Sequence, residues 1–477
     1  MRKTKIICTI GPASEKEEVL KKMIEAGMNV ARLNFSHGSH PEHQAKIDTI
    51  KKVREEMEAP IAIMLDTKGP EYRIGVFKNH KVTLTEGQDF TFTIDDVEGD
   101  ETRVSVNYKG FTKDLKPGDK VLVNNGLVIC VVKKIKGNEV LTTVEAAGVL
   151  SDHKSMNFPG KVMSNAYLSE TDKEDLLFGI KNEVDFVAAS FVSTKQDAQD
   201  LRDFLDANGG ENIEIIAKIE NRSGVEHVKE ICEVVSGIMV ARGDLGVEIP
   251  FMEVPAIQKD IVQDCRMIGK RVIIATEMLE SMIQNVRPTR AEISDVANAV
   301  YDGASAIMLS GESAAGLHPV EAVSVMSEVA EFTETNINYK KRFRASEFEA
   351  KDIMDAISHS TCSMAMDVNA KVIVVNSISG KTARMISRFR GPVQIIGMTT
   401  SWKAARKLAL SWGVLPVICE EFESMDVMFY HALKKATALL HLELGDVVVM
   451  TGGKPDRVSG NTDMIKIETI SKIYADK

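Results

Sequence analysis

Polar residues spaced two apart stand at the ends of several short apolar runs in this sequence. Lys218 and Glu220 form one such pair, and Arg32 and Asn34 form another. Residues two apart in a β-strand point to the same face, so each pair presents its polar groups to one side. Carboxylates from neighbouring strands can hold a hard divalent cation together with substrate oxygens. Glu220 and Asp244 are therefore the candidates for a Mg²⁺ site.

A second group of oxygen-bearing side chains carries little negative charge. Its members end two other apolar runs: Asn34, Ser36, Asp66 and Thr67. One carboxylate supplies less charge than divalent sites in proteins usually have, so this cluster suits a monovalent cation better.

Fixed positive charge completes the pattern. Arg32 and Lys218 would lie beside these oxygens, and Gly243 and Asp244 would offer backbone amides to an anion at the start of a helix. Such a set suits phosphoryl transfer, in which catalysis is mainly positioning and charge neutralisation. It also fits a metal-dependent aldolase or lyase that acts on an enolate. A structural ion pair would explain Lys218 with Glu220, but not polar residues at most of the strand ends.

The elements that must position these residues alternate regularly. Eight apolar runs lack polar alternation, which predicts strands buried on both faces. They cover residues 5–10, 29–35, 61–66, 185–192, 213–220, 237–241, 271–276 and 306–310. Helical patterns lie between them, for example over 16–25, 195–207 and 290–301. Eight such units predict a (β/α)₈ TIM barrel, whose catalytic groups stand at the carboxyl ends of the strands.

This rhythm is interrupted once and then restarts. Between the third and fourth runs, short alternating segments separated by Pro and Gly turns predict a small all-β domain, inserted as a lid at the carboxyl face of the barrel. Near the C-terminus, a helix over 352–366 and four further strands predict a doubly wound α/β domain. The predicted class is α/β, with the barrel over 1–69 and 164–342, the lid over 70–163 and a regulatory domain over 343–477.

Composition excludes several classes of protein. The 477 residues carry 59 Lys and Arg against 69 Asp and Glu, a formal charge of −10, which argues against binding to nucleic acid or to a membrane surface. Six scattered cysteines indicate reduced thiols rather than zinc ligands. No apolar run approaches the roughly 18 residues of a transmembrane helix. We therefore expect a cytoplasmic protein.

Long ungapped motifs make the sequence resemble the pyruvate kinase family. They are residues 5–14 (KIICTIGPAS), 31–38 (ARLNFSHG), 66–71 (DTKGPE), 238–250 (IMVARGDLGVEIP), 278–283 (MLESMI) and 287–292 (RPTRAE). The resemblance implies transfer of the phosphoryl group of phosphoenolpyruvate to ADP, which gives pyruvate and ATP in glycolysis. It also implies Mg²⁺ (or Mn²⁺) and K⁺ as cofactors, and a homotetramer.

The resemblance also implies a role for each matching residue. Lys218 would stabilise the phosphoryl group in transfer, and Thr276 would lie near the proton delivered to the enolate. The remaining roles are phosphoenolpyruvate binding by Arg32, Lys218, Gly243, Asp244 and Thr276, Mg²⁺ binding by Glu220 and Asp244, K⁺ binding by Asn34, Ser36, Asp66 and Thr67, and nucleotide binding by Arg73, Lys154 and His37. Glu71 occupies the position whose carboxylate accompanies K⁺ dependence.

Several positions depart from the family pattern. Asn124 and Asn125 replace two Asp residues of the lid, which removes charges that could meet Arg32 on closure. The other departures are Thr171, Ser193, Glu277, Ser313 and Ala315, in place of Lys, Arg, Gln, Thr and Lys. No metal ligand is lost. These changes motivate a rival interpretation, a non-catalytic sensor of phosphoenolpyruvate or a sugar phosphate built on the same fold.

A turn in the C-terminal domain offers hydroxyls and amides at a helix start, which suits a phosphate. It contains Ser377, Ser379, Gly380, Lys381 and Thr382. Val375 stands where a Walker A loop needs Gly, so that motif is excluded. In the family this loop binds an allosteric sugar phosphate or nucleotide, and residues 452–457 would close over its other end. An ordinary capped turn is the alternative.

Overall fold

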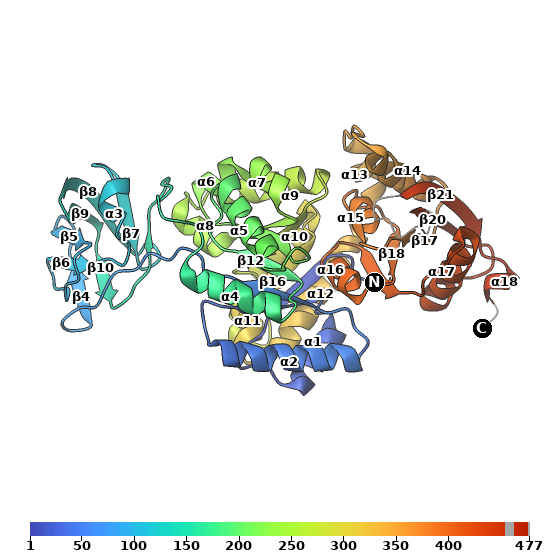
Figure 1. The fold of residues 1–477 in the computed structure, drawn as a ribbon, viewed down its shortest axis with the longest axis horizontal. Helices are drawn as coiled ribbons and strands as arrows, with labels where there is room; N and C mark the ends of the chain where they lie inside the picture. Colours follow the sequence, from blue (N-terminus) through green and yellow to red (C-terminus); the bar gives the residue numbers. More distant parts are fainter. Residues whose placement is uncertain (454–461, 476–477) are drawn as a thin grey trace.

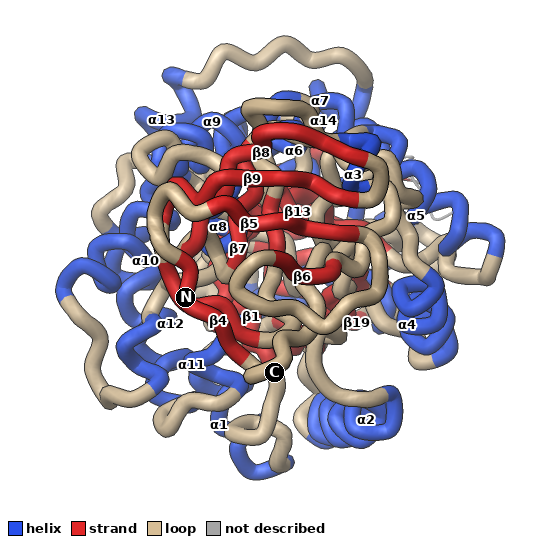
Figure 2. Tube along the Cα trace, turned by 90° about the vertical axis from the view of Figure 1, so that its left-hand side faces the viewer, coloured by secondary structure: helices blue, strands red, loops and turns tan. Residues whose placement is uncertain are grey.

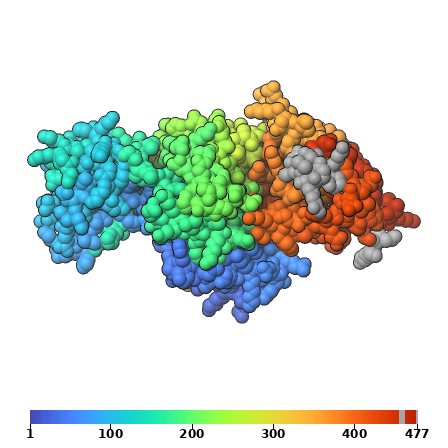
Figure 3. Space-filling model, viewed as in Figure 1, coloured from blue at the N-terminus to red at the C-terminus, as the bar shows by residue number. Residues whose placement is uncertain are grey.

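Three bodies lie in a row in the computed structural model, which describes residues 1–453 and 462–475. A β-rich lid stands at one end, a barrel at the centre and an α/β domain at the other end (Figure 1). The barrel touches each of the other two bodies (Figure 3). The barrel therefore carries the lid on one side and the C-terminal domain on the opposite side.

Eight parallel strands close into the central barrel, in the order β1-β16-β15-β14-β13-β12-β3-β2. Their bounds are β1 (Lys5–Thr9), β2 (Val30–Asn34), β3 (Ala62–Asp66), β12 (Phe186–Ala189), β13 (Glu214–Ile219), β14 (Gly237–Ala241), β15 (Arg271–Ala275) and β16 (Ala306–Leu309). Almost every strand residue is buried, because inward side chains fill the barrel and outward ones pack under helices. The predicted TIM barrel is confirmed, and each expected run contains one of these strands.

Helices surround the barrel: α1 (Glu17–Ala26), α2 (His40–Glu56), α4 (Glu170–Lys181), α5 (Lys195–Ala207), α6 (Arg222–Glu226), α7 (Val228–Val234), α8 (Arg242–Glu248), α9 (Val254–Met267), α10 (Arg290–Asp302), α11 (Gly311–Ala314) and α12 (Pro319–Thr335). Several start at capping boxes. Thr194 accepts a hydrogen bond from the backbone of Asp197, whose carboxylate accepts one from the backbone of Thr194. Such reciprocal bonds satisfy amides that a helix start leaves free, and they fix where the strand-to-helix loops turn.

The lid lies in the chain between β3 and α4, at the carboxyl ends of the barrel strands. Its elements are β4 (Lys81–Leu84), β5 (Asp89–Thr93), β6 (Arg103–Ser105), α3 (Phe111–Asp114), β7 (Lys120–Val123), β8 (Val128–Lys136), β9 (Glu139–Ala146), β10 (Gly148–Ser151) and β11 (Met156–Asn157). Six strands form a sheet in the order β11-β7-β8-β9-β5-β6, and β10 pairs with β4. Viewed from the lid end, this sheet stands in front of the barrel (Figure 2).

A five-stranded sheet forms the C-terminal domain, in the order β19-β18-β17-β20-β21. Its elements are α13 (Tyr339–Ala345), α14 (Ile353–Asp367), β17 (Val372–Asn376), α15 (Lys381–Ser387), β18 (Gln394–Thr399), α16 (Trp402–Leu408), β19 (Val414–Ile418), α17 (Met425–Leu440), β20 (Val447–Gly453), β21 (Thr462–Thr469) and α18 (Lys472–Ala475). Separate apolar cores lie on its two faces, one with α14 and α15 and one with α17. The doubly wound prediction is confirmed. The edge strand β21, antiparallel to β20, was not predicted.

No helix within residues 1–453 and 462–475 is long and apolar enough to cross a bilayer.

Lys5 ties the barrel to the C-terminal domain. Its Nζ donates a hydrogen bond to the backbone carbonyl of Val414 in β19, at 2.7 Å, and the residue is buried. Burial lowers the pKa of Lys5 to about 7, and Arg2 acts in the same direction, while Glu334 partly opposes them. A folded-state pKa so far below 10.5 means that the junction holds Lys5 more easily without its proton.

We expect this lysine to make stability rise with pH. Below pH 7 Lys5 is charged in both the folded and the unfolded chain, so folding bears the full free-energy cost of burying a charged lysine. Above pH 7 the folded chain releases the proton while the unfolded chain keeps it, which adds up to about 1.4 kcal/mol of stability per pH unit. The midpoint temperature of thermal unfolding should therefore rise more steeply between pH 7 and 9 for the wild type than for Lys5→Met. Lys22→Met, at an exposed position on α1, is the control. Equal slopes for all three proteins would contradict the prediction.

Candidate active site

A cavity of about 460 Å³ lies between the lid and the carboxyl end of the barrel. Nine of the residues predicted for the site line it: Arg32, Asn34, Ser36, His37, Arg73, Lys154, Lys218, Glu220 and Asp244. The barrel strands and the loops after them supply six of these, α8 supplies Asp244, and the lid segment supplies Arg73 and Lys154. Both domains therefore enclose the space in which the predicted groups meet.

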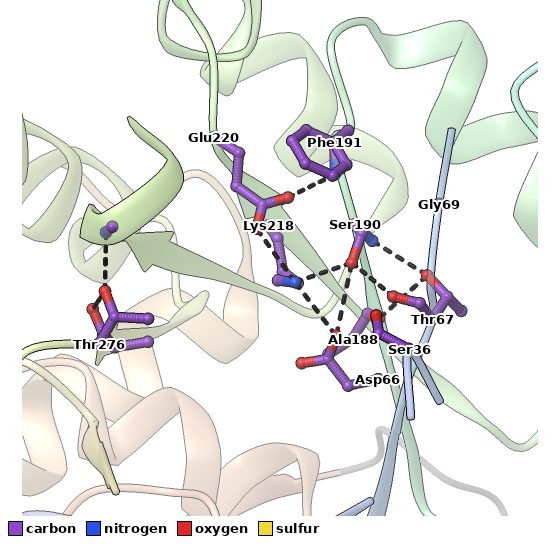
Figure 4. Close-up of polar contacts among 12 residues, drawn as sticks. Ser36, Asp66, Thr67, Gly69, Ala188, Ser190, Phe191, Lys218, Glu220 and Thr276 are labelled. Carbon is purple, nitrogen blue, oxygen red and sulfur yellow. Dashed lines mark hydrogen bonds and ion pairs between the residues drawn. The ribbon is translucent and has the colours of Figure 1, made fainter. Parts of the chain in front are cut away.

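Lys218, near the end of β13, stands at the centre of a buried polar network (Figure 4). Its Nζ lies 3.1 Å from Asp66 Oδ1 and 3.0 Å from Glu220 Oε1, and donates to Ser190 Oγ at 2.7 Å. Asp66 also accepts from Arg32 Nε at 2.6 Å. The strand-end residues thus converge as the barrel topology requires, and two cations share a site with two carboxylates.

The charges in this network shift one another's pKa values. Burial by itself would lower the pKa of Lys218, but Asp66 and Glu220 outweigh it and raise that pKa above its ordinary value. Burial would raise the pKa of Asp66, yet Arg32 and Lys218 lower it overall. Lys218 therefore carries a full positive charge at neutral pH, in a position that water scarcely reaches.

Glu220 is the least satisfied member of the network. Its Oε2 accepts the backbone N–H of Phe191 at 2.6 Å, but its fully buried Oε1 has only the ion pair with Lys218 and no hydrogen bond from any residue in the described ranges. Burial raises the pKa of Glu220 to about 7, with Lys218 opposing and Asp244 adding to the shift. A divalent cation between Glu220 and Asp244 would remove this repulsion, so the two residues fit a Mg²⁺ site.

Two carboxylates are few for a cation held by protein alone. Residues 1–453 and 462–475 contain no group of three or more His, Cys, Asp or Glu side chains arranged to hold a metal. Mg²⁺ keeps several ligands from water or substrate phosphates and commonly uses only one or two carboxylates. The donor set therefore suits a cation that is shared with an anionic substrate.

The low-charge oxygen cluster also assembles. Asn34 in β2 pairs with Asp66 in β3, and Asn34 Oδ1 accepts the backbone N–H of Ser36 at 3.2 Å. Thr67 Oγ1 accepts the backbone N–H of Ser190 at 3.1 Å. Amide, hydroxyl and carboxylate oxygens therefore lie at the ends of β2 and β3. A monovalent cation bound there would share the negative charge of Asp66 with Arg32.

Thr276 pairs with Gly243, and Figure 4 shows Thr276 apart from the network around Lys218. Thr276 follows β15 with a φ of 69°, a conformation that β-branched residues rarely adopt. Its Oγ1 accepts the backbone N–H of Gly243, at the start of α8, at 2.8 Å. Neither residue is among those that line the cavity. The backbone N–H of Gly243, which we predicted to bind an anion, is thus already hydrogen-bonded to Thr276.

On the lid side of the cavity, the carboxylate of Glu71 pairs with two basic side chains. Arg73 contacts its carboxylate through Nε at 3.0 Å and Nη2 at 2.7 Å, and Lys68 Nζ lies 3.1 Å away. Burial would raise the pKa of Glu71, but Arg73 and Lys68 lower it overall. Arg73 Nη1 also donates to the carbonyl of His153 at 2.8 Å. The guanidinium is therefore fixed at the rim of the cavity.

The two lid asparagines occupy a tight turn between β7 and β8. Asn124 and Asn125 each have a φ of 55°, and Gly126 has a φ of 78°. Asn tolerates this left-handed conformation better than most residues, which suits a hairpin turn. Asn125 Oδ1 accepts from Ser155 Oγ at 3.1 Å, and both asparagines line the cavity. Of the other departures, Ser313 is buried and donates to the carbonyl of Thr9, while Thr171, Glu277 and Ala315 are exposed.

Sequence reasoning missed the contribution of the fourth barrel strand. Ser190 and Phe191 follow β12, and they bind Lys218 and Glu220 respectively. Phe191 adopts a φ of 56°, which turns its N–H toward the Glu220 carboxylate. The same rule that selected polar residues at the other strand ends would have selected Ser190. Phe191 gave no signal, since its contribution is a backbone group.

The predicted effector loop lies at the start of α15. Gly380 has a φ of 75°, and Ser379 and Lys381 are exposed. Thr382 is buried, and its hydroxyl shares a hydrogen bond with that of Thr462 at 2.6 Å, so it joins α15 to the edge strand β21. In the predicted closing segment, residues 454–457 lie outside the described residues.

Comparison with known proteins places both the barrel and the C-terminal domain. The family model described as "Pyruvate kinase, barrel domain" matches residues 1–323, and "Pyruvate kinase, alpha/beta domain" matches residues 355–468. A pyruvate kinase of Clostridium acetobutylicum is 47% identical over 98% of this chain and 100% of its own length, and one of Staphylococcus saprophyticus is 46% identical over 98% and 81%. The crystal structure of a pyruvate kinase from Cryptosporidium parvum superposes with a TM-score of 0.94 at 37% identity, covering 98% of this chain and 96% of that one. The chain therefore belongs to the pyruvate kinase family.

Proposed function

We propose that this chain transfers the phosphoryl group of phosphoenolpyruvate to ADP at the cavity between barrel and lid, with Mg²⁺ (or Mn²⁺) and K⁺ as cofactors. The observation that carries the proposal is the position of Lys218, charged and buried among Asp66, Glu220 and Ser190 beside an open cavity. A reaction whose transition state spreads negative charge over phosphoryl oxygens needs such fixed cations.

Each residue has a stated part in this reaction. Arg32 and Lys218 would bind the phosphoryl oxygens, and Lys218 would keep its charge while the group moves. Glu220 and Asp244 would hold Mg²⁺, which supplies charge neutralisation on the phosphates when bound. Thr276, with its hydroxyl against Gly243, would hold a proton near the enolate carbon. The K⁺ site would consist of Asn34, Ser36, Asp66 and Thr67.

Arg73, Lys154 and His37 would receive the nucleotide phosphates. Replacing Arg73 with Met should raise the KM for ADP about tenfold while the KM for phosphoenolpyruvate changes little, because the guanidinium lies at the lid side of the cavity, away from Lys218. Initial rates at varied ADP and varied phosphoenolpyruvate measure the two constants. Arg103→Met, on an exposed position of β6, is the control. Equal increases in both constants would contradict the nucleotide role.

A lactate-dehydrogenase-coupled assay with Mg²⁺ and K⁺ tests the reaction itself. Turnover is expected, and its absence at high enzyme concentration would favour the non-catalytic sensor. Two observations oppose the sensor: the candidate Mg²⁺ ligands and Lys218 are all present, and Arg32 is held by Asp66 within the same network. An aldolase would instead cleave carbon–carbon bonds without ADP.

The C-terminal loop is the proposed effector site. Ser377, Ser379, Gly380, Lys381 and Thr382 would receive the phosphate of a sugar phosphate or nucleotide in a cytoplasmic homotetramer. Initial rates at low phosphoenolpyruvate, with candidate sugar phosphates, AMP and K⁺ added in turn, test regulation. Light scattering after size-exclusion chromatography tests the tetramer.

A further inference from the structure

Ser190 is a buried serine that follows β12 and contacts the proposed catalytic lysine. Only 2% of the residue is exposed. Its Oγ accepts a hydrogen bond from Lys218 Nζ at 2.7 Å, shorter than the separation of that nitrogen from either carboxylate. The ammonium group donates hydrogen bonds to Asp66 and Ser190 and forms an ion pair with Glu220, so two carboxylates and one hydroxyl surround it. Ser190 is the single uncharged member of this set.

The hydroxyl of Ser190 has a short and a long acceptor. The backbone carbonyl of Thr67 lies 2.6 Å from its Oγ and Asp66 Oδ1 lies 3.4 Å away, so the shorter hydrogen bond to Thr67 orients the hydroxyl and leaves lone pairs for Lys218. The backbone is fixed as well, because Thr67 Oγ1 accepts the N–H of Ser190 and the Tyr167 hydroxyl donates to its carbonyl at 2.8 Å. Gly69 packs so closely that an added Cβ would lie 2.8 Å from Ser190 Cβ. Ser190 therefore has little freedom to move.

An uncharged acceptor in this place has a particular consequence. With carboxylates alone, the ammonium would settle against Asp66 and Glu220, whose oxygens are the candidate ligands for cations. A rigid hydroxyl 2.7 Å from the ammonium nitrogen draws that nitrogen toward Ser190 and away from the two carboxylates, without adding negative charge. The interaction of a neutral oxygen with an ammonium group is also strong enough to select one side-chain conformation.

We propose that Ser190 is a positioning residue for Lys218: its oriented hydroxyl fixes the ammonium group where the phosphoryl group passes. This role of Ser190 rests on the proposed role of Lys218. Ser190 acts through Lys218 and does not itself contact substrate.

Ser190→Ala tests the proposal at saturating Mg²⁺ and K⁺. We expect kcat to fall by roughly 10–100-fold while the KM for phosphoenolpyruvate stays within about threefold, because the charge of Lys218 remains but its position is lost. Ser190→Thr keeps the hydroxyl and should recover most of kcat. Ser190→Cys places a slightly larger group there that is only a weak acceptor, and it should lose kcat as Ser190→Ala does. Ser358→Ala removes another fully buried serine hydroxyl, in α14, and should change neither constant.

Two further measurements separate this role from its rivals. In a double-mutant cycle, adding Ser190→Ala to Lys218→Met should lower kcat no further, because a residue that acts through Lys218 has nothing left to position. An additional loss of equal size would overturn the proposal, as would recovery of Ser190→Ala at higher K⁺, which would assign Ser190 to the cation cluster through Thr67. Unchanged kcat in both Ser190→Ala and Ser190→Cys would refute it while leaving wild-type turnover, and hence the proposed function, intact.

Discussion

Replacing Lys218 with Met is expected to lower kcat by about 10²–10³-fold or more while phosphoenolpyruvate still binds. Methionine keeps the length of the side chain but removes the charge that the pair of Asp66 and Glu220 stabilises in the wild type. A charge fixed in a water-poor site contributes most where negative charge develops, so its removal affects the transition state more than the ground state. Turnover is measured with the coupled assay, and binding by calorimetric titration with phosphoenolpyruvate.

Stability must be measured beside activity for this variant. Lys218→Met leaves two buried carboxylates with one cation fewer, so the thermal midpoint should fall, since breaking a buried pair from one side is costly. Lys218→Arg is the matched comparison, because it keeps the charge but has a planar group that cannot occupy the position of the ammonium. It should also lose kcat, with a smaller change in the midpoint. Activity of Lys218→Met close to that of wild type would refute the proposed role.

The cavity shows how an acidic chain can accept anionic substrates. The net charge is −10, yet the described cavity lining contains Arg32, Lys68, Arg73, Lys154 and Lys218. Two carboxylates of the lining are paired with these cations, Glu71 with Arg73 and Glu220 with Lys218, and the buried Asp66 pairs with Arg32 and Lys218. Local arrangement, rather than net charge, therefore decides which ligands can approach.

The barrel and most of the candidate site were predictable from the sequence because both follow from strand geometry. A residue at the carboxyl end of a barrel strand must face the same mouth as its counterparts on the other strands. Lys218, near the end of β13, and Glu220, directly after that strand, therefore point to one mouth, where Lys218 pairs with Glu220 and with Asp66 of β3. The alternation of side chains fixed their direction without any knowledge of the loops.

Other features depend on interactions that a linear pattern does not contain. The pairing of Thr276 with Gly243 requires a left-handed φ at a β-branched residue, which the surrounding loop imposes. The N–H that Phe191 donates to Glu220 is a backbone group with no side-chain signature. Strand β21 runs antiparallel at an exposed sheet edge, and its sequence lacks the continuous apolar run that marked the buried strands.

Glu220→Gln is expected to have the second large effect, because it removes one of two carboxylates proposed to hold Mg²⁺. Changes in residues that merely orient metal ligands cost 10–100-fold in affinity, so loss of a direct ligand should cost at least that much. Titration with Mn²⁺, followed by electron paramagnetic resonance of the free ion, measures this without turnover. We expect Mn²⁺ binding to weaken by roughly 10–100-fold or more and kcat to fall with it.

Glu312→Gln is the matched control. Glu312 is also a buried carboxylate, in the short helix α11 that follows β16, but its oxygens accept the backbone N–H groups of Leu279 and Ser310, at 3.0 Å and 2.7 Å. Its replacement should lower the thermal midpoint and leave Mn²⁺ binding unchanged. Glu220→Gln should instead weaken Mn²⁺ binding and leave the thermal midpoint nearly unchanged. Oε1 of Glu220 has no hydrogen bond to lose within the described chain, and burial already disfavours the charge of this carboxylate. Equal Mn²⁺ affinity in the two variants would show that Glu220 is a structural carboxylate, and that the cation is held elsewhere.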